Sequence, residues 1–183
     1  MKKIQESRRV RMTKRLMKDA LLELLDRKNL VNISVKEICE TADVHRATFY
    51  LHYSDQAELL REIEQDFLDQ IPDPPEILDE KGQKSLLEAT TAFFDNVREN
   101  RNTVRILFGE SADNSFSSRL VEYLCARYIP VGGTTDESSA RFLQLYVANG
   151  TVGMMREWVN SDFPICSQGI AEMMYFLSRK IIP

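Results

Sequence analysis

Residues 34–53 read SVKEICETADVHRATFYLHY, and this stretch has the pattern of two short helices joined by a tight turn. Ser34 and Glu37 have the spacing of a capping box, which is a sequence signature of a helix start. Residues 42–44 supply the turn, and a second short helix is expected over about 45–51. This is the layout of a helix-turn-helix, whose second helix can enter the major groove of DNA.

Each helix of this segment has an apolar side and an exposed side. The apolar residues are Val35, Ile38, Cys39, Ala42, Val44 and Phe49. The exposed side of the second helix is expected to carry His45, Arg46, Ala47, Thr48, Tyr50 and His52. The Arg46 guanidinium can donate two hydrogen bonds to guanine O6 and N7. Thr48, Tyr50 and His52 can donate to phosphate oxygens. Lys36, at the start of the first of these helices, can reach a phosphate or a base edge. The segment therefore predicts a DNA-binding face; a helical packing unit without DNA contact is the alternative.

The charges of the chain divide unevenly along its length. Residues 1–53 contain 12 Lys and Arg against 7 Asp and Glu, a balance of +5, whereas residues 54–183 have a balance of −9. An acidic chain with a basic first third is typical of a protein that meets a polyanion through that third alone. Charge alone is equally compatible with a chance fluctuation, so the motif in 34–53 decides the interpretation.

Apolar residues recur at helical spacing on both sides of this segment, and no glycine precedes Gly82. We therefore expect an all-α protein. One helix over about 9–27 precedes the motif, and a linking fourth helix follows it over 55–71. Further helices are expected over about 83–100, 102–109, 115–129, 136–159 and 167–181.

Prolines mark the clearest boundary in the chain. The run Pro72-Asp73-Pro74-Pro75 ends the fourth helix, because proline lacks an N–H donor and disfavours helix at the preceding residue. The sequence thus predicts a three-helix DNA-binding domain with its linking helix over 1–71. A larger helical domain for regulation and dimerisation is expected over 72–183.

The run from Thr13 to Ile63 resembles the N-terminal domain of TetR-family regulators. The matching features are the leading amphipathic helix, Ser-Val-xx-Ile-Cys from Ser34, the run from Ala42 to Tyr53, and a capped helix with Leu59-Leu60. The string Thr-Phe-Tyr-Leu-His-Tyr over 48–53 is the most specific part. The resemblance implies an all-α homodimer in which each subunit contacts double-stranded DNA. By position, it implies that Arg46 and Ala47 face base edges, that Lys36 lies at the groove edge, and that Thr48, Tyr50 and His52 hold phosphates.

The chain departs from the family pattern at two positions. Asp43 stands in the turn where the family usually has glycine, and Asp tolerates the left-handed backbone better than most residues. Gln56 stands where the family usually has a phosphate-binding lysine, so one ionic contact is expected to be lost. The basic residues that could compensate are Arg8, Arg9, Arg11, Lys14 and Arg15. A solvated basic tail without DNA contact is the alternative.

The last two long helices carry the expected dimer contacts. The family pairs these helices with those of a second subunit, and Gly150 and Gly153 would permit a close approach there. Packing of the same residues inside one subunit is the alternative. The segment Tyr146–Val159 also resembles the subgroup that includes the dihydroxyacetone-kinase regulator, whose members can answer to a protein partner.

A pocket for a small molecule would lie among the helices over 83–130. Its candidate lining residues are aromatic: Phe93, Phe94, Phe108, Tyr123 and Tyr128. Aromatic residues at helical spacing are more often core than pocket lining, so a filled core is the alternative.

The sequence argues against several other classes of protein. Cys39, Cys125 and Cys166 lie far apart without a CxxC pair, which disfavours a disulfide framework and a zinc site. Neither a glycine-rich phosphate loop nor an HExxH motif is present, and we expect no enzymatic activity, metal or cofactor. No apolar run is long enough to cross a bilayer, and no signal-peptide core follows the basic N-terminus. We therefore expect a cytoplasmic protein without membrane contact.

These observations lead to one preferred hypothesis and one alternative. The preferred hypothesis is a sequence-specific DNA-binding transcriptional regulator that represses transcription and is released by a small-molecule effector. The alternative is a similar regulator that is switched by a protein co-regulator and has no small-molecule pocket.

Overall fold

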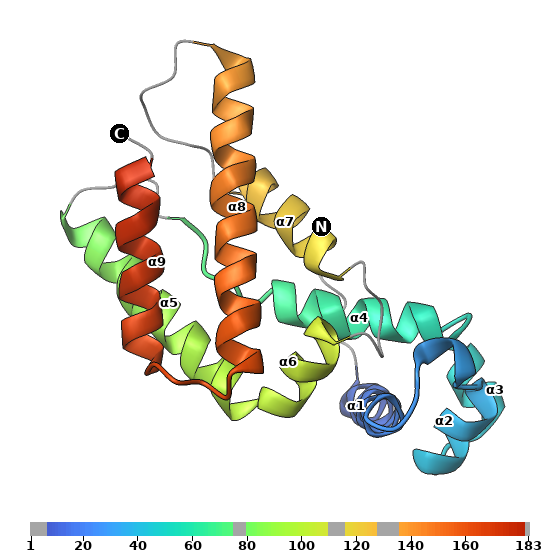
Figure 1. Cartoon of the computed structure of the whole chain (residues 1–183). Helices are drawn as coiled ribbons and strands as arrows, with labels where there is room; N and C mark the ends of the chain where they lie inside the picture. Colours follow the sequence, from blue (N-terminus) through green and yellow to red (C-terminus); the bar gives the residue numbers. More distant parts are fainter. Residues whose placement is uncertain (1–6, 75–79, 110–115, 128–135, 182–183) are drawn as a thin grey trace. The chain divides into compact units, whose positions relative to one another are not determined.

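The computed structural model describes residues 7–74, 80–109, 116–127 and 136–181, and within them it contains helices and no strand (Figure 1). The all-α fold class is confirmed. The α-helices are α1 (Arg8–Leu25), α2 (Val35–Thr41), α3 (Arg46–Tyr50), α4 (Gln56–Leu68), α5 (Glu80–Glu99), α6 (Arg101–Phe108), α7 (Phe116–Arg127), α8 (Glu137–Asn160) and α9 (Ser167–Ile181). A 3-10 turn over Leu30–Asn32 connects α1 to α2. None of the helices in the described ranges is long and apolar enough to cross a membrane.

Backbone contacts divide the chain into two compact units. Of the described residues, the first unit comprises 7–66 with Gly109, and the second comprises 67–74, 80–108, 116–127 and 136–181. The division therefore falls near the end of α4. The functional domain boundary that the prolines predict after residue 71 is a separate matter and stays a prediction.

In the first unit, α1 supplies the apolar surface on which the helix-turn-helix is built. The Ser7 hydroxyl caps α1 by accepting a hydrogen bond from the Val10 N–H at 3.3 Å. The apolar stripe of α1 is buried through Met17, Ala20, Leu21 and Leu25. The buried residues of the motif itself are Ile38, Cys39, Ala42, Phe49 and Tyr53, and Ile33 directly before it is buried as well. Burial of these two stripes accounts for the three-helix arrangement, because short helices gain most of their stability from tertiary packing.

In the second unit, the core contains a continuous row of packed aromatic rings, which we call the aromatic chain. Phe94 lies between Phe93 and Trp158, with ring centroids 5.3 Å away on each side. Phe67 continues the chain from Phe93 to Phe116, at 5.6 Å in each step. The pairs meet edge to face, the geometry that aromatic rings prefer.

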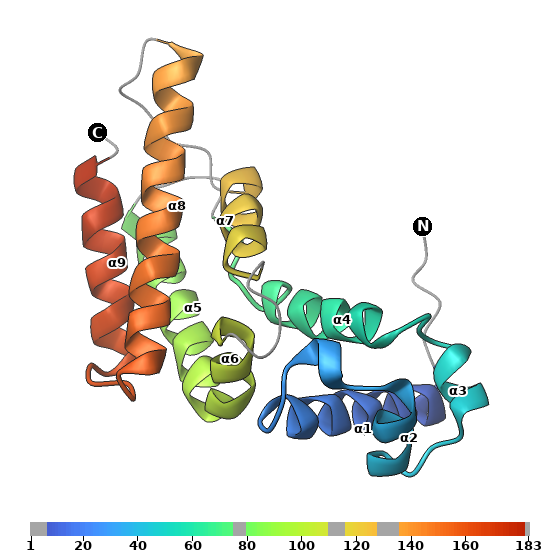
Figure 2. The same ribbon diagram turned by 45° about the vertical axis from the view of Figure 1, so that its right-hand side comes forward.

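The turn between α8 and α9 is held by side chains from both sides. Asp162 and Phe163 adopt left-handed backbone conformations, with φ of 61° and 58°. Arg105 of α6 donates to the Asp162 carboxylate at 2.7 Å, and the Phe163 ring packs on Trp158 at 4.7 Å. The Trp158 Nε1–H donates to the Ile165 carbonyl at 2.8 Å. These contacts fix the antiparallel course of α8 and α9, which lie side by side in both views (Figures 1 and 2).

Candidate nucleic-acid interface

The start of α2 is fixed by a reciprocal cap. The Ser34 backbone N–H donates to the Glu37 carboxylate at 2.9 Å, and the Glu37 N–H donates to the Ser34 hydroxyl at 3.3 Å. The capping box expected from the sequence is thus confirmed. A hydrogen bond from Lys28, together with those from the Ser34 backbone and hydroxyl, lowers the pKa of Glu37 to about 2. The carboxylate is therefore ionised at neutral pH, where it also complements the positive end of the helix dipole.

The turn between α2 and α3 depends on Asp43. Its φ of 52° is in the left-handed region, as expected for the position where glycine is usual. The Val44 N–H donates to the Cys39 carbonyl at 3.0 Å, which closes the end of α2. The direction in which α3 leaves the turn follows from this conformation.

α3 is anchored by one fully buried side chain. Phe49 has no exposed surface, and its ring lies 5.6 Å from that of Tyr53. Burying Phe49 turns the neighbouring residues of this short helix outward. Tyr50 packs edge to face on Phe49 at 5.7 Å while 58% of its surface remains exposed.

The seven residues that sequence analysis selects for DNA contact fall into two groups. Lys36, His45, Arg46, Ala47 and Tyr50 are exposed, whereas Thr48 and His52 are half-buried. We call these seven residues the recognition face. Lys36 also lies 3.6 Å from Glu40, an exposed ion pair of the weak kind that a phosphate can displace.

Leu51 is a surface residue that sequence analysis does not select. It is 80% exposed and directly follows Tyr50 at the end of α3. An apolar side chain in this position can contact a thymine methyl group. The available signal was its place between two selected residues, Tyr50 and His52.

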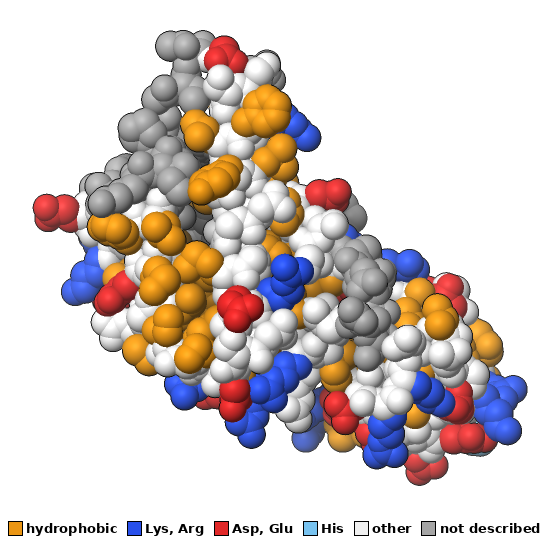
Figure 3. Space-filling model, viewed as in Figure 1, with side chains coloured by type: hydrophobic (Ala, Val, Ile, Leu, Met, Phe, Trp, Pro, Cys, Tyr) orange, Lys and Arg blue, Asp and Glu red, His pale blue; other side chains and the backbone are white. Residues whose placement is uncertain are grey.

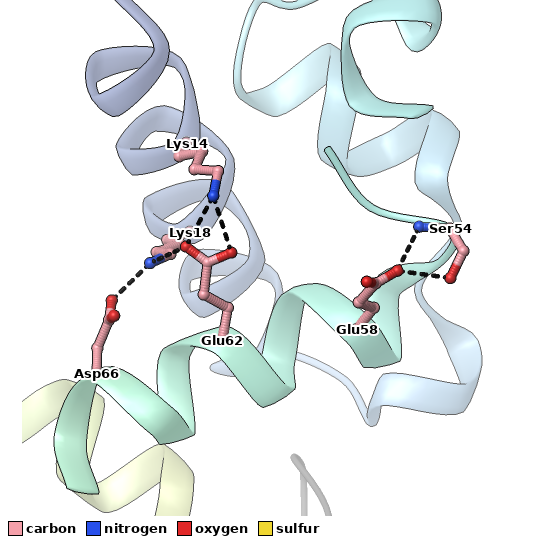
Figure 4. A network of polar contacts seen from close by, with 6 residues as sticks. All are labelled: Lys14, Lys18, Ser54, Glu58, Glu62 and Asp66. Carbon is pink, nitrogen blue, oxygen red and sulfur yellow. Dashed lines mark hydrogen bonds and ion pairs between the residues drawn. The ribbon is translucent and has the colours of Figure 1, made fainter. Parts of the chain in front are cut away.

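The start of α4 shows how the Gln56 position is built. The Glu58 carboxylate accepts hydrogen bonds from the Ser54 N–H and hydroxyl, each at 2.7 Å (Figure 4). The Asp55 carboxylate accepts from the Glu58 N–H at 2.7 Å. Ser54 and Asp55 therefore both make capping contacts at the start of this helix. Gln56 is the first residue of α4 and is half-buried.

The basic residues of α1 are divided between two roles. Arg8, Arg9 and Arg11 are exposed. Lys14, by contrast, donates to the Glu62 carboxylate of α4 at 3.3 Å, so it is held in an ion pair in addition to any DNA contact (Figure 4). The expectation that Lys14 is one of the basic residues available to DNA did not include this pairing.

A second lysine completes this cluster. Lys18 lies 2.8 Å from Glu62 and 2.5 Å from Asp66. Burial lowers the pKa of Lys18, but its hydrogen bonds to the two carboxylates outweigh that effect and raise it overall. Burial likewise raises the pKa of Glu62, yet hydrogen bonds from Lys18 and Tyr53 and the charges of both lysines hold it below its ordinary value. The four residues Lys14, Lys18, Glu62 and Asp66 are named the α1–α4 ion cluster below.

The described candidate pocket residues belong to the second unit and differ in how deeply they are buried. Phe93 and Phe94 are buried within the aromatic chain, whereas Phe108 and Tyr123 are half-buried. Phe108 packs on Phe116 at 5.5 Å, and Tyr123 lies under the guanidinium of Arg127 at 4.9 Å. Tyr128 lies outside the described residues. Within the described ranges, no group of three or more His, Cys, Asp and Glu is arranged to hold a metal ion.

Comparison with protein families gives two matches that cover both units. Residues 19–63 match the bacterial regulatory proteins of the tetR family, and residues 84–180 match a transcriptional regulator C-terminal region that belongs with it. A search among curated proteins finds no match.

Several solved structures share the fold over nearly the whole chain. The dihydroxyacetone kinase operon activator DhaS is 20% identical, with a TM-score of 0.60, over 93% of this chain and 96% of that one. A TetR transcriptional regulator from Streptococcus agalactiae is 18% identical, with a TM-score of 0.64, over 93% and 96%. NalD, the secondary repressor of the MexAB-OprM multidrug efflux pump in Pseudomonas aeruginosa, is 17% identical, with a TM-score of 0.61, over 96% and 98%. At these identities the likeness concerns the fold.

Proposed function

The chain belongs to the TetR family of DNA-binding transcriptional regulators, and on that basis we propose that it is a repressor that binds operator DNA through the recognition face. The observation that carries this proposal is the arrangement around Phe49. Its complete burial turns Arg46, Ala47 and Tyr50 outward together from one short helix. A helix presented in this way can enter the major groove while its flanking residues hold phosphates.

Each residue of the recognition face has a role in the proposal. Arg46 and Ala47 contact base edges, and His45 and Lys36 lie at the edge of the groove. Thr48, Tyr50 and His52 donate to phosphate oxygens. Occupancy of a promoter by such a protein blocks other proteins from the same DNA, which is the basis of repression.

The regulator is proposed to act as a homodimer joined through α8 and α9. The apolar side chains Phe142 and Tyr146 of α8 are 74% and 66% exposed, and α9 exposes Met173, Phe176 and Leu177. Figure 3 shows orange apolar surface over α9 and the upper part of α8. A Cβ atom added at Gly150 or Gly153 would meet nothing within 4 Å, so the described part of the chain leaves these two positions of α8 uncovered. A second copy would bury these residues and place two recognition faces on a two-fold symmetric site.

Two modes of release are proposed, and the aromatic chain bears on the choice between them. Release by a small molecule beside α5, α6 and α7 would use Phe108 and Tyr123, which are only half-buried. Phe93 and Phe94 could line such a pocket only if their rings separated. The close packing of these two rings favours the second candidate, a protein co-regulator that binds the C-terminal unit. DhaS, whose name describes an operon activator, has a similar fold, so regulators of this shape need not all be repressors.

The experiment that tests the proposal is selection of DNA by the purified full chain from a random pool. The expected result is enrichment of a two-fold symmetric sequence whose binding weakens as salt rises, since phosphate contacts release counterions. Failure to enrich any sequence, with weak and salt-independent binding, would overturn the proposal. Reporter transcription from a promoter that contains the selected sequence then distinguishes repression from activation.

A further inference from the structure

The α1–α4 ion cluster is more sheltered than an ordinary surface salt bridge. The side chains of Lys14 and Lys18 are only 20% and 16% exposed, and that of Glu62 is 31% exposed. Glu62 is the shared member, because its carboxylate lies between the two ammonium groups at 3.3 Å and 2.8 Å (Figure 4). Charges that are partly withdrawn from water are screened less by salt than exposed ones.

A contact of Lys14 links this cluster to the recognition helix. The Lys14 Nζ lies 5.8 Å from the ring centroid of Tyr53, a distance at which a cation and an aromatic face attract. Tyr53 is almost fully buried and packs on Phe49, the anchor of α3, at 5.6 Å. A continuous series of contacts therefore runs from Glu62 through Lys14 and Tyr53 to Phe49.

We propose that Glu62 is a positioning residue for DNA recognition, which holds Lys14 against Tyr53 and thereby fixes the orientation of α3. This inference rests on the proposed function, in which α3 contacts bases. Glu62 itself touches no DNA. Loss of its charge leaves Lys14 free to leave the Tyr53 ring, so the support beneath Phe49 loosens and base contacts by Arg46 become less well aligned.

A competing role for Lys14 predicts the opposite sign. If Lys14 were a phosphate ligand, Glu62 would compete with DNA for it. Removing the Glu62 charge would then strengthen binding and steepen its salt dependence, because one more cation would be free to meet phosphate. A positioning role weakens the preference for the selected sequence and leaves the salt dependence unchanged.

The test uses the full chain and the duplex that the wild-type protein selects from a random pool. Affinity is measured for that duplex and for one in which the most strongly preferred base pair is exchanged. The variants are Glu62→Gln and Lys14→Met, which remove charge and keep side-chain length. Lys18→Met is the matched control, because Lys18 has a similar exposure and also pairs with Glu62. Among the described residues, however, Lys14 and not Lys18 makes the cation–ring contact with Tyr53.

For Glu62→Gln and Lys14→Met we expect the ratio of the two affinities to fall about fivefold or more, the fold-change at the lower end of one good base contact. For Lys18→Met we expect that ratio to stay within about twofold, the usual scatter between independent sites. Thermal unfolding of each variant shows that it is folded at the assay temperature. If Glu62→Gln does not fold, the comparison of Lys14→Met with Lys18→Met decides alone.

Two other outcomes are distinguishable. If the wild-type protein selects no duplex, the proposed function fails and this inference fails with it. If the wild-type protein selects a duplex and Glu62→Gln binds it with an unchanged or higher preference, only the positioning role is overturned.

Discussion

Lys28 and Glu37 form an ion pair that joins the segment after α1 to the first turn of α2. Glu37 also completes the cap with Ser34, so one carboxylate stabilises the start of the helix-turn-helix in two ways. Its pKa of about 2 lies below the ordinary value of 4.5. A carboxylate with a lowered pKa contributes stability that is complete above its unfolded pKa and is lost as the pH falls toward its folded pKa.

Glu37→Gln should therefore lower the melting temperature at pH 7 by a few degrees. The difference from the wild-type protein should shrink as the pH falls from about 4.5 to about 2, because the wild-type carboxylate is then protonated. Circular dichroism melts at several pH values provide the measurement. Glu40→Gln is the control, since Glu40 is exposed and makes one long ion pair on the same helix. A difference that stays constant down to pH 2 would contradict this account of Glu37.

Arg46→Ala should relax the base preference at one position of the selected duplex by roughly 1–3 kcal/mol, the range for one bidentate base contact. Affinities for duplexes changed at that base pair provide the measurement. Arg27→Ala is the control, because Arg27 is an exposed arginine that lies just beyond the end of α1 and pairs with Glu23. An unchanged preference for Arg46→Ala would mean that α3 meets the DNA in another orientation.

Gln56→Lys should restore the ionic contact that is usual at the start of α4. Affinity should rise at low salt, and the slope of log affinity against log salt should steepen by about one, as for one added phosphate contact. Salt titrations of the selected duplex measure both quantities. Gln56→Met, which adds no charge, should leave the slope unchanged; a parallel change in both variants would point to packing at this half-buried position instead.

Asp43→Val should destabilise the chain by about 1–2 kcal/mol, because a β-branched residue fits the left-handed conformation poorly. Asp43→Gly should keep the stability near that of the wild-type protein. Urea unfolding followed by circular dichroism compares the two. Equal stability of the valine and glycine variants would show that the turn can adopt another backbone conformation.

Tyr146→Glu should convert the proposed dimer into a monomer, since a charge without a partner at an apolar interface costs several kcal/mol. Sedimentation equilibrium measures the mass of the particle. Lys84→Glu, a charge change at an exposed position of α5, is the control and should leave the mass unchanged. A dimer that persists in Tyr146→Glu would place the interface elsewhere.

The sequence predicts most of the helices closely because their apolar residues recur at helical spacing. The expected helix over 136–159 is α8, Glu137–Asn160, and the one over 102–109 is α6, Arg101–Phe108. The left-handed conformation of Asp43 also agrees with the expectation, because glycine is usual at this position in the family that the sequence resembles. Local patterns of this kind need no knowledge of how distant helices meet.

The α1–α4 ion cluster shows where such prediction ends. Lys14 and Glu62 are 48 residues apart, as are Lys18 and Asp66, so their pairing depends on the packing of α1 against α4. A signal did exist in the sequence, because the two lysines are four residues apart on α1 and the two carboxylates are four residues apart on α4. The sequence alone, however, makes Lys14 look like one more cation for DNA. Only its place beside Glu62 and Tyr53 gives it a second role.

Trp158 is the single tryptophan of the chain, and it lies in the aromatic chain of the second unit between Phe94 and Phe163. Intrinsic fluorescence excited at the red edge of protein absorption therefore reports on that unit alone, while far-ultraviolet circular dichroism reports on helices in both. If the two signals change at different denaturant concentrations, the units unfold independently, and coincident transitions indicate one cooperative event. The protein thus carries an intrinsic optical probe of its second unit, with no need for a chemical dye.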